Sequence, residues 1–309
     1  MKEINRFKYT LDNKRYHTFN YFLKNKFGKK VFKVALDAGF TCPNKKTGGC
    51  IYCSDGSKSN IVNNKKSIQE QFEEVKNIML NKWPDSLYIP YFQANTNTYD
   101  SLDKLKELYE PILNNENVVG LAIATRPDCI TDEILNYLDE LNKKTFLMIE
   151  LGLQSSYDKT LEYINRGHTV KEFDDMVKKL KERNIFVVVH IINGLPHETK
   201  DMMIETIKHL NNLNIDAIKI HMLHVDKNTK LADIYEKEKF HLLTKEEYID
   251  IVTEQLTYLK PEIVIERITG DPILEDLIEP KWLLKKFVLL NDIDKEMIKK
   301  NYYQGINCK

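Results

Sequence analysis

The sequence has no surplus of charge, because 46 lysines and arginines are matched by 46 aspartates and glutamates among its 309 residues. This balance argues against a protein that binds nucleic acid through an overall basic field. Two groups of lysines nevertheless stand out: Lys24, Lys26, Lys29, Lys30 and Lys33, and then Lys281, Lys285 and Lys286. We expect most of them to be solvated, and the first group is the candidate for a local phosphate-binding patch.

The sequence also lacks a long hydrophobic run. No apolar stretch approaches the roughly 20 residues that span a bilayer. The N-terminal segment, MKEINRFKYT, lacks the apolar region of a secretory signal. We therefore expect a cytoplasmic protein with no membrane partner. Disulfides are rare in that compartment, so closely spaced cysteines there suggest metal or redox chemistry.

Cysteine is scarce, with five residues, yet three of them lie in Cys42–Cys53, read CPNKKTGGCIYC. This stretch is rich in Gly, Pro, Asn and Lys and follows the apolar run Val31–Asp37, which predicts a loop leaving a strand end. Three thiolates can hold three irons of a [4Fe–4S] cluster and leave the fourth iron open to a small molecule.

Other metals fit parts of the same loop. The pair Cys50 and Cys53 alone would suit zinc or a dithiol equally well. A structural zinc site usually needs four ligands, and the thirty residues after Cys53 contain no histidine or cysteine. A catalytic zinc site with three ligands stays open at this point.

Apolar strand-like segments alternate with segments of helical period. The six strand candidates are Val31–Asp37, Leu87–Gln93, Val118–Thr125, Thr145–Gln154, Ile185–Ile192 and Asp216–His224. Capping boxes mark three helix starts, at Ser67 with Glu70, Thr169 with Glu172 and Thr244 with Glu247. Repeated strand–helix units with right-handed crossovers predict an α/β fold, a partial (β/α)6 TIM-like barrel. Ligands gather at the C-terminal strand ends of such sheets, where the cysteine loop begins.

The pattern weakens after His224. We expect a helix around Thr244–Leu259, a short strand Glu262–Ile268 and helices after Pro280 and Asp292. The predicted organisation is an N-terminal lead-in over residues 1–30 that packs on the main domain, a barrel over 31–230 and a C-terminal extension over 231–309.

Several motifs at strand ends carry a family resemblance. Beside the cysteine loop, with Tyr52 before its last cysteine, they are Tyr91–Thr98 (YFQANTNT), Glu150–Ser155 (ELGLQS), Asn193–Thr199 (NGLPHET), Arg15–Asn20, Ala124–Cys129, Asn165–His168, Lys219–His224 and Arg267–Asp271. Together they resemble the radical SAM superfamily in its YhcC/YtqA-like branch, which is related to the radical SAM portion of the Elongator catalytic subunit. The spacing before the second cysteine is longer than the superfamily's usual one.

The resemblance implies two cofactors, a [4Fe–4S] cluster and S-adenosylmethionine (SAM). Cys42, Cys50 and Cys53 would ligate the cluster. The residues implied to hold SAM are Tyr52, Gln93, Asn95, Thr96, Gln154, Arg166 and Gly194. Gly194 would let the backbone approach the adenine, because it carries no Cβ. The chain departs from the relatives' pattern at Ala124 and His190, where those proteins carry acids.

The resemblance also implies a reaction and a substrate. One-electron cleavage of SAM would release a 5′-deoxyadenosyl radical that abstracts hydrogen from an unactivated carbon. The branch is associated with the wobble uridine of tRNA, where a 5-carboxymethylaminomethyl group would become 5-aminomethyl. The implied partners are tRNA and a one-electron donor such as flavodoxin or ferredoxin. The candidate catalytic residues are Arg126, Glu150, His221 and His224.

Two other functions use the same cysteines. One is a hydrolase whose zinc is held by the three thiolates, and the other is a non-catalytic iron–sulfur protein that binds RNA or transfers electrons. Among the remaining thiols, Cys129 is expected to be a buried apolar group or a hydrogen donor near the site, and Cys308 incidental.

Overall fold

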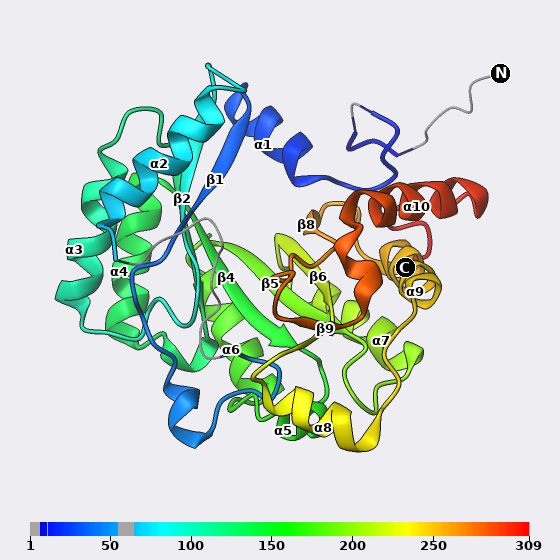
Figure 1. The fold of residues 1–309 in the computed structure, drawn as a ribbon. Coiled ribbons are helices and arrows are strands. Elements are labelled where there is room, and N and C mark those ends of the chain that lie inside the picture. Colours follow the sequence, from blue (N-terminus) through cyan, green and yellow to red (C-terminus); the bar gives the residue numbers. More distant parts are fainter. Residues whose placement is uncertain (1–6, 11, 55–64, 309) are drawn as a thin grey trace.

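The protein is described by a computed structural model that covers residues 7–10, 12–54 and 65–308. Its centre is a curled sheet of seven parallel strands in the order β1-β2-β3-β4-β5-β6-β8 (Figure 1). The strands are β1 Val31–Leu36, β2 Leu87–Phe92, β3 Gly120–Thr125, β4 Phe146–Gln154, β5 Phe186–Asn193, β6 Ala217–Met222 and β8 Val264–Arg267. The α/β partial barrel predicted from the sequence is confirmed, and the short strand expected near residue 265 joins the sheet at its edge.

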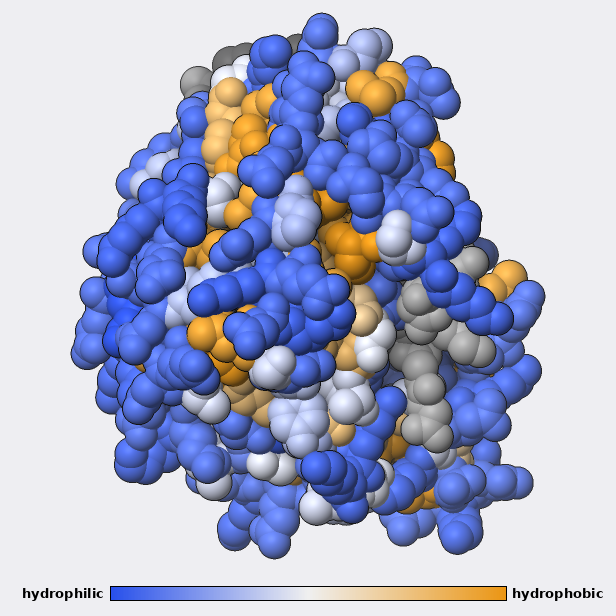
Figure 2. All heavy atoms as spheres, turned by 90° about the vertical axis from the view of Figure 1, so that its left-hand side faces the viewer, coloured by the Kyte–Doolittle hydropathy of each residue, from blue (hydrophilic) through white to orange (hydrophobic). Residues whose placement is uncertain are grey.

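Helices cover the outer face of the sheet and complete the main hydrophobic core. They are α2 Ile68–Leu80, α3 Leu102–Leu113, α4 Asp132–Lys144, α6 Val170–Lys181, α7 Lys200–Asn212 and α9 Lys245–Tyr258. Each presents an apolar stripe at helical spacing, such as Phe173, Val177 and Leu180 of α6, which are fully buried. Figure 2 shows the face on the left-hand side of Figure 1, which is mainly hydrophilic with hydrophobic residues between the hydrophilic ones.

The starts of these helices follow the sequence. The capping boxes predicted at Ser67, Thr169 and Thr244 are all formed, with both reciprocal hydrogen bonds present. Each box satisfies backbone donors that the first helical turn leaves unpaired.

The inside of the barrel is closed at the amino-terminal ends of its strands. A layer of apolar side chains from all seven strands fills this end: Val31, Ile89, Ala122, Met148, Val188, Ala217 and Val264. Helix α1, Phe19–Phe27, packs under this layer through Leu23 and Phe22, whose ring lies 5.1 Å from that of Phe186. Helix α1 therefore packs against the strands and covers the barrel at their amino-terminal ends.

The position of α1 also places the first lysine group. Lys24, Lys26 and Lys29 lie on α1 or just after it, before the first residue of β1. Substrates enter such barrels at the other end, where the strands finish. The predicted phosphate patch therefore lies at the opposite end of the barrel from the cysteine loop, away from where a substrate would enter.

The C-terminal segment folds back over the barrel. It contains a two-stranded antiparallel sheet, β7 Val225–Asp226 with β9 Leu277–Glu279, and the short helices α8 Lys230–Glu238 and η3 Lys281–Leu284. The small sheet was not predicted. Beyond Pro280 the expected break at Asp292 is wrong, because α10 runs through it from Lys286 to Lys299. No described helix is long and apolar enough to cross a membrane.

Candidate active site

The cysteine loop leaves the carboxyl end of β1 and is held in place by the turn after α5, Asp158–Tyr163. Within the loop, Pro43–Thr47 form the 3-10 helix η1, and Gly48 and Gly49 follow with φ of 93° and 71°. The side chain of Asn165 donates to the carbonyls of Thr47 (3.1 Å) and Gly49 (2.7 Å). These contacts fix the backbone from which the thiols project.

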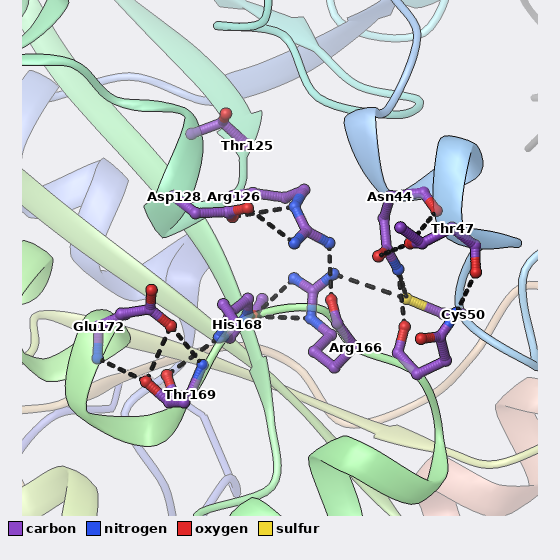
Figure 3. Close-up of polar contacts among 12 residues, drawn as sticks. Asn44, Thr47, Cys50, Thr125, Arg126, Asp128, Arg166, His168, Thr169 and Glu172 are labelled. Atoms are coloured by element: carbon purple, nitrogen blue, oxygen red, sulfur yellow. Dashed lines mark hydrogen bonds and ion pairs between the residues drawn. The ribbon is translucent and has the colours of Figure 1, made fainter.

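Cys50 is the most constrained thiol of the loop. It is buried, and its sulfur accepts hydrogen bonds from Asn44 Nδ2 at 3.4 Å and from the Arg166 guanidinium at 3.8 Å (Figure 3). A hydrogen bond from Cys53 and the charge of Arg166 lower the pKa of Cys50 to about 5, although burial opposes this. The same bond raises the pKa of Cys53. The lowered pKa favours the thiolate, the form that binds metals.

The three loop thiols are not arranged around one point. Among the described residues, no group of three or more His, Cys, Asp or Glu side chains lies as it would around a single metal ion. A [4Fe–4S] cluster takes each thiolate on a different iron, so its ligands are spread over a larger core.

Arg166 joins the cysteine loop to the end of β4. Its NH2 group donates to the Gly152 carbonyl at 2.7 Å, and His168 Nε2 lies 3.1 Å from the same oxygen. A Cβ at residue 152 would lie 2.7 Å from Arg166 NH2 and would also meet the Gln154 amide. A glycine at this position therefore lets the predicted cofactor residues Gln154 and Arg166 converge. Burial and the charge of Arg166 lower the pKa of His168 to about 4, so this ring is neutral.

The loop after β2 closes the other side of the cysteine loop. Asn95 Nδ2 donates to the Phe40 carbonyl at 2.9 Å, and the Thr96 amide donates to the Thr41 carbonyl at 3.3 Å. Thr96 Oγ1 and Asn97 Oδ1 are buried without a hydrogen-bond partner among the described residues. Gln93 is anchored through its backbone amide to Leu36 (3.1 Å), and its side chain is half-buried.

At the end of β5, Gly194 adopts φ of 83°, the left-handed region that favours glycine. A Cβ there would lie 2.9 Å from Leu243 Cδ1, in the segment before α9. The C-terminal segment also reaches the cysteine loop, because the Leu231 amide of α8 donates to the Ile51 carbonyl at 2.8 Å. Tyr52, half-buried, packs in the same apolar cluster as Leu231.

Arg126 does not present a free guanidinium. Its side chain is buried and makes two parallel hydrogen bonds to Asp128, each 2.9 Å long, and a third to the Arg166 carbonyl at 2.8 Å (Figure 3). This geometry fits a brace for the Arg166 turn better than a group that binds a substrate carboxylate. Cys129, nearby in sequence, is buried as expected, and burial raises its pKa to about 12.

A second layer of side chains crosses the barrel above the apolar layer. This polar layer consists of Lys33, Tyr91, Glu150, His190, Lys219 and Glu266. Its centre is Glu150, fully buried, which accepts from all the others except Glu266: Lys33, Tyr91 (2.8 Å), His190 (2.7 Å) and Lys219 (2.6 Å). Burial alone would raise the pKa of Glu150, but Lys219 and Lys33 hold it well below its usual value.

The two predicted histidines of β6 and its end have different surroundings. His221 faces His190 with ring centroids 5.5 Å apart, and burial together with nearby positive groups keeps its pKa well below normal. His224 is instead turned toward Asp226 of β7, with Nε2 3.2 Å from Oδ2. The structure thus places Glu150 and His221 on either side of His190, which both of them contact, and places His224 with the C-terminal sheet.

Comparison with known proteins agrees with this geometry. The family model of the radical SAM superfamily matches residues 39–210, and that of the radical SAM C-terminal domain matches 215–299. The chain belongs to the radical SAM superfamily, and it is a radical SAM enzyme. It is 44% identical to YtqA of Bacillus subtilis over 99% of this chain and 96% of that protein. It is 31% identical to YhcC of Escherichia coli, over 88% of this chain and 89% of that protein.

More distant radical SAM relatives share part of their length with this chain. The tRNA uridine(34) acetyltransferase of Methanocaldococcus jannaschii is 26% identical over 68% of this chain and 37% of its own. Among solved structures, the Elp3 of Methanocaldococcus infernus superposes with a TM-score of 0.68 at 19% identity, covering 89% of this chain and 64% of that one. This last likeness supports the partial-barrel fold.

Several residues of the candidate site were missed by the sequence reasoning. Asn44 and His168 contact Cys50 and Gly152, and neither was predicted to do so, because an asparagine in a turn and a histidine near a cap usually serve the local backbone. Lys33 and Lys219 were missed as a pair although each interrupts an apolar strand. A charged residue on the inward face of such a strand is the signal that could have found them.

Proposed function

We propose that this radical SAM enzyme carries a [4Fe–4S] cluster on Cys42, Cys50 and Cys53 and acts on the wobble uridine of tRNA, converting 5-carboxymethylaminomethyluridine to 5-aminomethyluridine. The observation that carries the proposal is the surroundings of Cys50. Its buried sulfur accepts hydrogen bonds from Asn44 and Arg166, at the end of the sheet where such barrels bind ligands.

The residues around the loop fit both cofactors. Thiolates are the ligands of iron–sulfur clusters, and hydrogen bonds to the sulfur, like those from Asn44 and Arg166, tune their reduction potential. The unpartnered buried oxygens of Thr96 and Asn97 offer acceptors for a polar ligand beside the loop. When bound, the cluster and SAM supply a radical that removes a hydrogen atom from an unactivated carbon.

The chain itself controls access to that chemistry. The apolar layer and α1 close the bottom of the barrel, so a substrate group enters only from the side of the cysteine loop. The segments that carry Leu231 and Leu243 narrow this side by packing on Ile51 and beside Gly194. A sheltered chamber protects a reactive intermediate from water and from side reactions.

Transfer RNA as the substrate rests on relatives. The tRNA uridine(34) acetyltransferase is named for the wobble position of tRNA. Its similarity to this chain covers 68% of this chain. We propose Lys45 and Lys46 as phosphate contacts in place of the group on α1. Both are exposed on η1 beside the cysteine loop, at the open end of the barrel.

The test compares bulk tRNA from cells with and without the gene by nucleoside mass spectrometry. The proposal predicts that 5-carboxymethylaminomethyluridine accumulates in the deletion strain and disappears on complementation with the wild-type gene. Complementation with Cys50→Ala should fail. Unchanged wobble uridines would exclude this substrate, and iron-free zinc-containing protein after anaerobic purification would instead support the three-cysteine hydrolase.

A further inference from the structure

The polar layer lies inside the barrel, between the apolar layer and the end where the cysteine loop lies. Below it lie the apolar layer and the apolar side chains of α1. His190 stands on β5, between β4 and β6, and its side chain is 21% exposed. Because His190 Nε2 lies 2.7 Å from Glu150 Oε2, the ring belongs to the polar layer on the inner face of the sheet. The polar layer can therefore be touched by a group that enters from the side of the cysteine loop.

One carboxylate oxygen of the polar layer has no hydrogen-bond partner among the described residues. Glu266 Oε1 receives Lys33 at 2.7 Å and Lys219 at 3.0 Å, whereas Glu266 Oε2 is buried without a hydrogen-bond partner among the described residues. The side chain is only 7% exposed. A buried carboxylate oxygen left without a donor is costly, so its retention points to a donor that arrives with a ligand.

The neighbouring His221 could also form a hydrogen bond with an entering group. It lies on β6 two residues beyond Lys219 and therefore on the same inward face, nearer the open end. Among the described residues its ring nitrogens have no hydrogen-bond partner, and the ring that faces it is that of His190. An entering group meets His221 first and Glu266 afterwards.

The charges of the polar layer define what that group can be. Lys33 and Lys219 balance Glu150 and Glu266, and Glu150 is already saturated with donors. A ligand with a large net charge would upset this balance in a poorly solvated space. A ligand that offers an N–H donor and carries no net charge would satisfy the free oxygen and leave the balance intact.

We infer that the polar layer binds an amino group of the substrate, with Glu266 Oε2 as the acceptor and His221 lining the approach. This rests on the proposed function, in which the wobble base projects its side chain into the barrel. A carboxymethylamino arm is zwitterionic and has N–H donors next to the carbon that would lose hydrogen. Glu266 then selects amine-bearing uridines and holds that carbon at a fixed depth.

The experiment measures binding by fluorescence anisotropy under anaerobic conditions, with cluster-loaded protein and SAM but no reductant. Two anticodon stem-loop RNAs are compared, one with 5-carboxymethylaminomethyluridine and one with unmodified uridine at the wobble position. Wild type should prefer the modified RNA by on the order of tenfold or more, the range of one charge-assisted hydrogen bond. Glu266→Gln should lose most of this preference, because the acceptor is no longer charged.

Glu262→Gln is the matched control, because Glu262 is exposed just before the same strand and should keep the preference. If Glu266→Gln does not fold, Glu266→Asp keeps the charge for the lysines, withdraws the acceptor and should lose part of the preference. An unchanged preference in a folded Glu266 variant, or none in wild type, overturns the inference. Reductive formation of 5′-deoxyadenosine by wild type tests the proposed function separately.

Discussion

At the scale of single residues, the site is held by hydrogen bonds that converge on a few side chains. Arg166 links the Cys50 sulfur, the Gly152 carbonyl and, through its own carbonyl, Arg126. Removing its guanidinium would change the electrostatics of the thiolate and withdraw two hydrogen bonds from Gly152 without touching the thiolates themselves. A variant of Arg166 can therefore change the surroundings of the proposed cluster without removing any of its three thiolate ligands.

We expect Arg166→Gln to retain iron and sulfide, to alter the electron paramagnetic resonance signal of the reduced cluster and to lower the rate of 5′-deoxyadenosine formation by about tenfold or more, because a hydrogen-bonded cation beside the sulfur is removed. Arg183→Gln is the control, since among the described residues the Arg183 side chain bonds only to a helix carbonyl. A normal signal and a normal rate in Arg166→Gln would contradict the assignment.

Gly194 gives a second prediction at this scale. Gly194→Ala places a Cβ at φ of 83° and 2.9 Å from Leu243, so it should lower the free energy of unfolding by about 1–3 kcal/mol. The double variant with Leu243→Ala relieves the clash but keeps the backbone strain. Denaturant unfolding of both variants and of Leu243→Ala alone separates these effects, and additive losses would show that the clash is absent.

At the scale of elements, the sheet is closed by segments from both ends of the chain. Helix α1 covers the bottom, and the Ile265 amide of β8 donates to the His17 carbonyl at 2.7 Å, which covers the sheet edge. On the opposite side, β7 begins just after His224 and carries its partner Asp226. The pairing of these two side chains ties the end of β6 to the small C-terminal sheet.

This pairing should make stability depend on pH. Burial opposes protonation of His224, but the Asp226 hydrogen bond and charge raise its pKa above the unfolded value of about 6.5. Its contribution is therefore fully present below about pH 6.5 and is lost as the pH rises through the raised pKa. Asp226→Asn should cost about 1 kcal/mol near pH 6 and less near pH 9.

The check is denaturant unfolding of wild type and Asp226→Asn across this pH range, with the exposed Asp233→Asn as the control for removing one acid. A cost that is constant with pH, or one that grows on the alkaline side, would show that His224 is not charged in the folded protein.

At the scale of the whole molecule, the features predicted correctly from the sequence are those whose signal lies in neighbouring residues. The six strands of apolar residues and the three capping boxes were found because their signals lie within one element. The polar layer was not found as a unit, since Lys33 and Glu266 lie 233 positions apart and meet only when the barrel curls. The same holds for the lysines of α1, whose side of the sheet is fixed by tertiary packing on Phe146 and Phe186.

The two groups of lysines, one on η1 and one on or near α1, give a prediction for tRNA binding. Lys45→Glu with Lys46→Glu should weaken binding and make the affinity less sensitive to salt, lowering the log–log slope by about one for each phosphate that is no longer bound. Lys24→Glu with Lys29→Glu makes the same change of charge at the closed end and should leave both quantities near the wild-type values. Filter binding over a range of salt concentrations measures them, and the reverse order of effects would place tRNA on the α1 side.

The decisive assay follows the formation of 5′-deoxyadenosine by anaerobically reconstituted protein supplied with SAM and dithionite. We expect wild type to form it and Cys50→Ala, with an unchanged circular dichroism spectrum, not to form it. Wild-type protein that contains iron and sulfide yet forms none, or a Cys50→Ala variant that forms it at the wild-type rate, would contradict the claim that these three thiolates hold the reactive cluster.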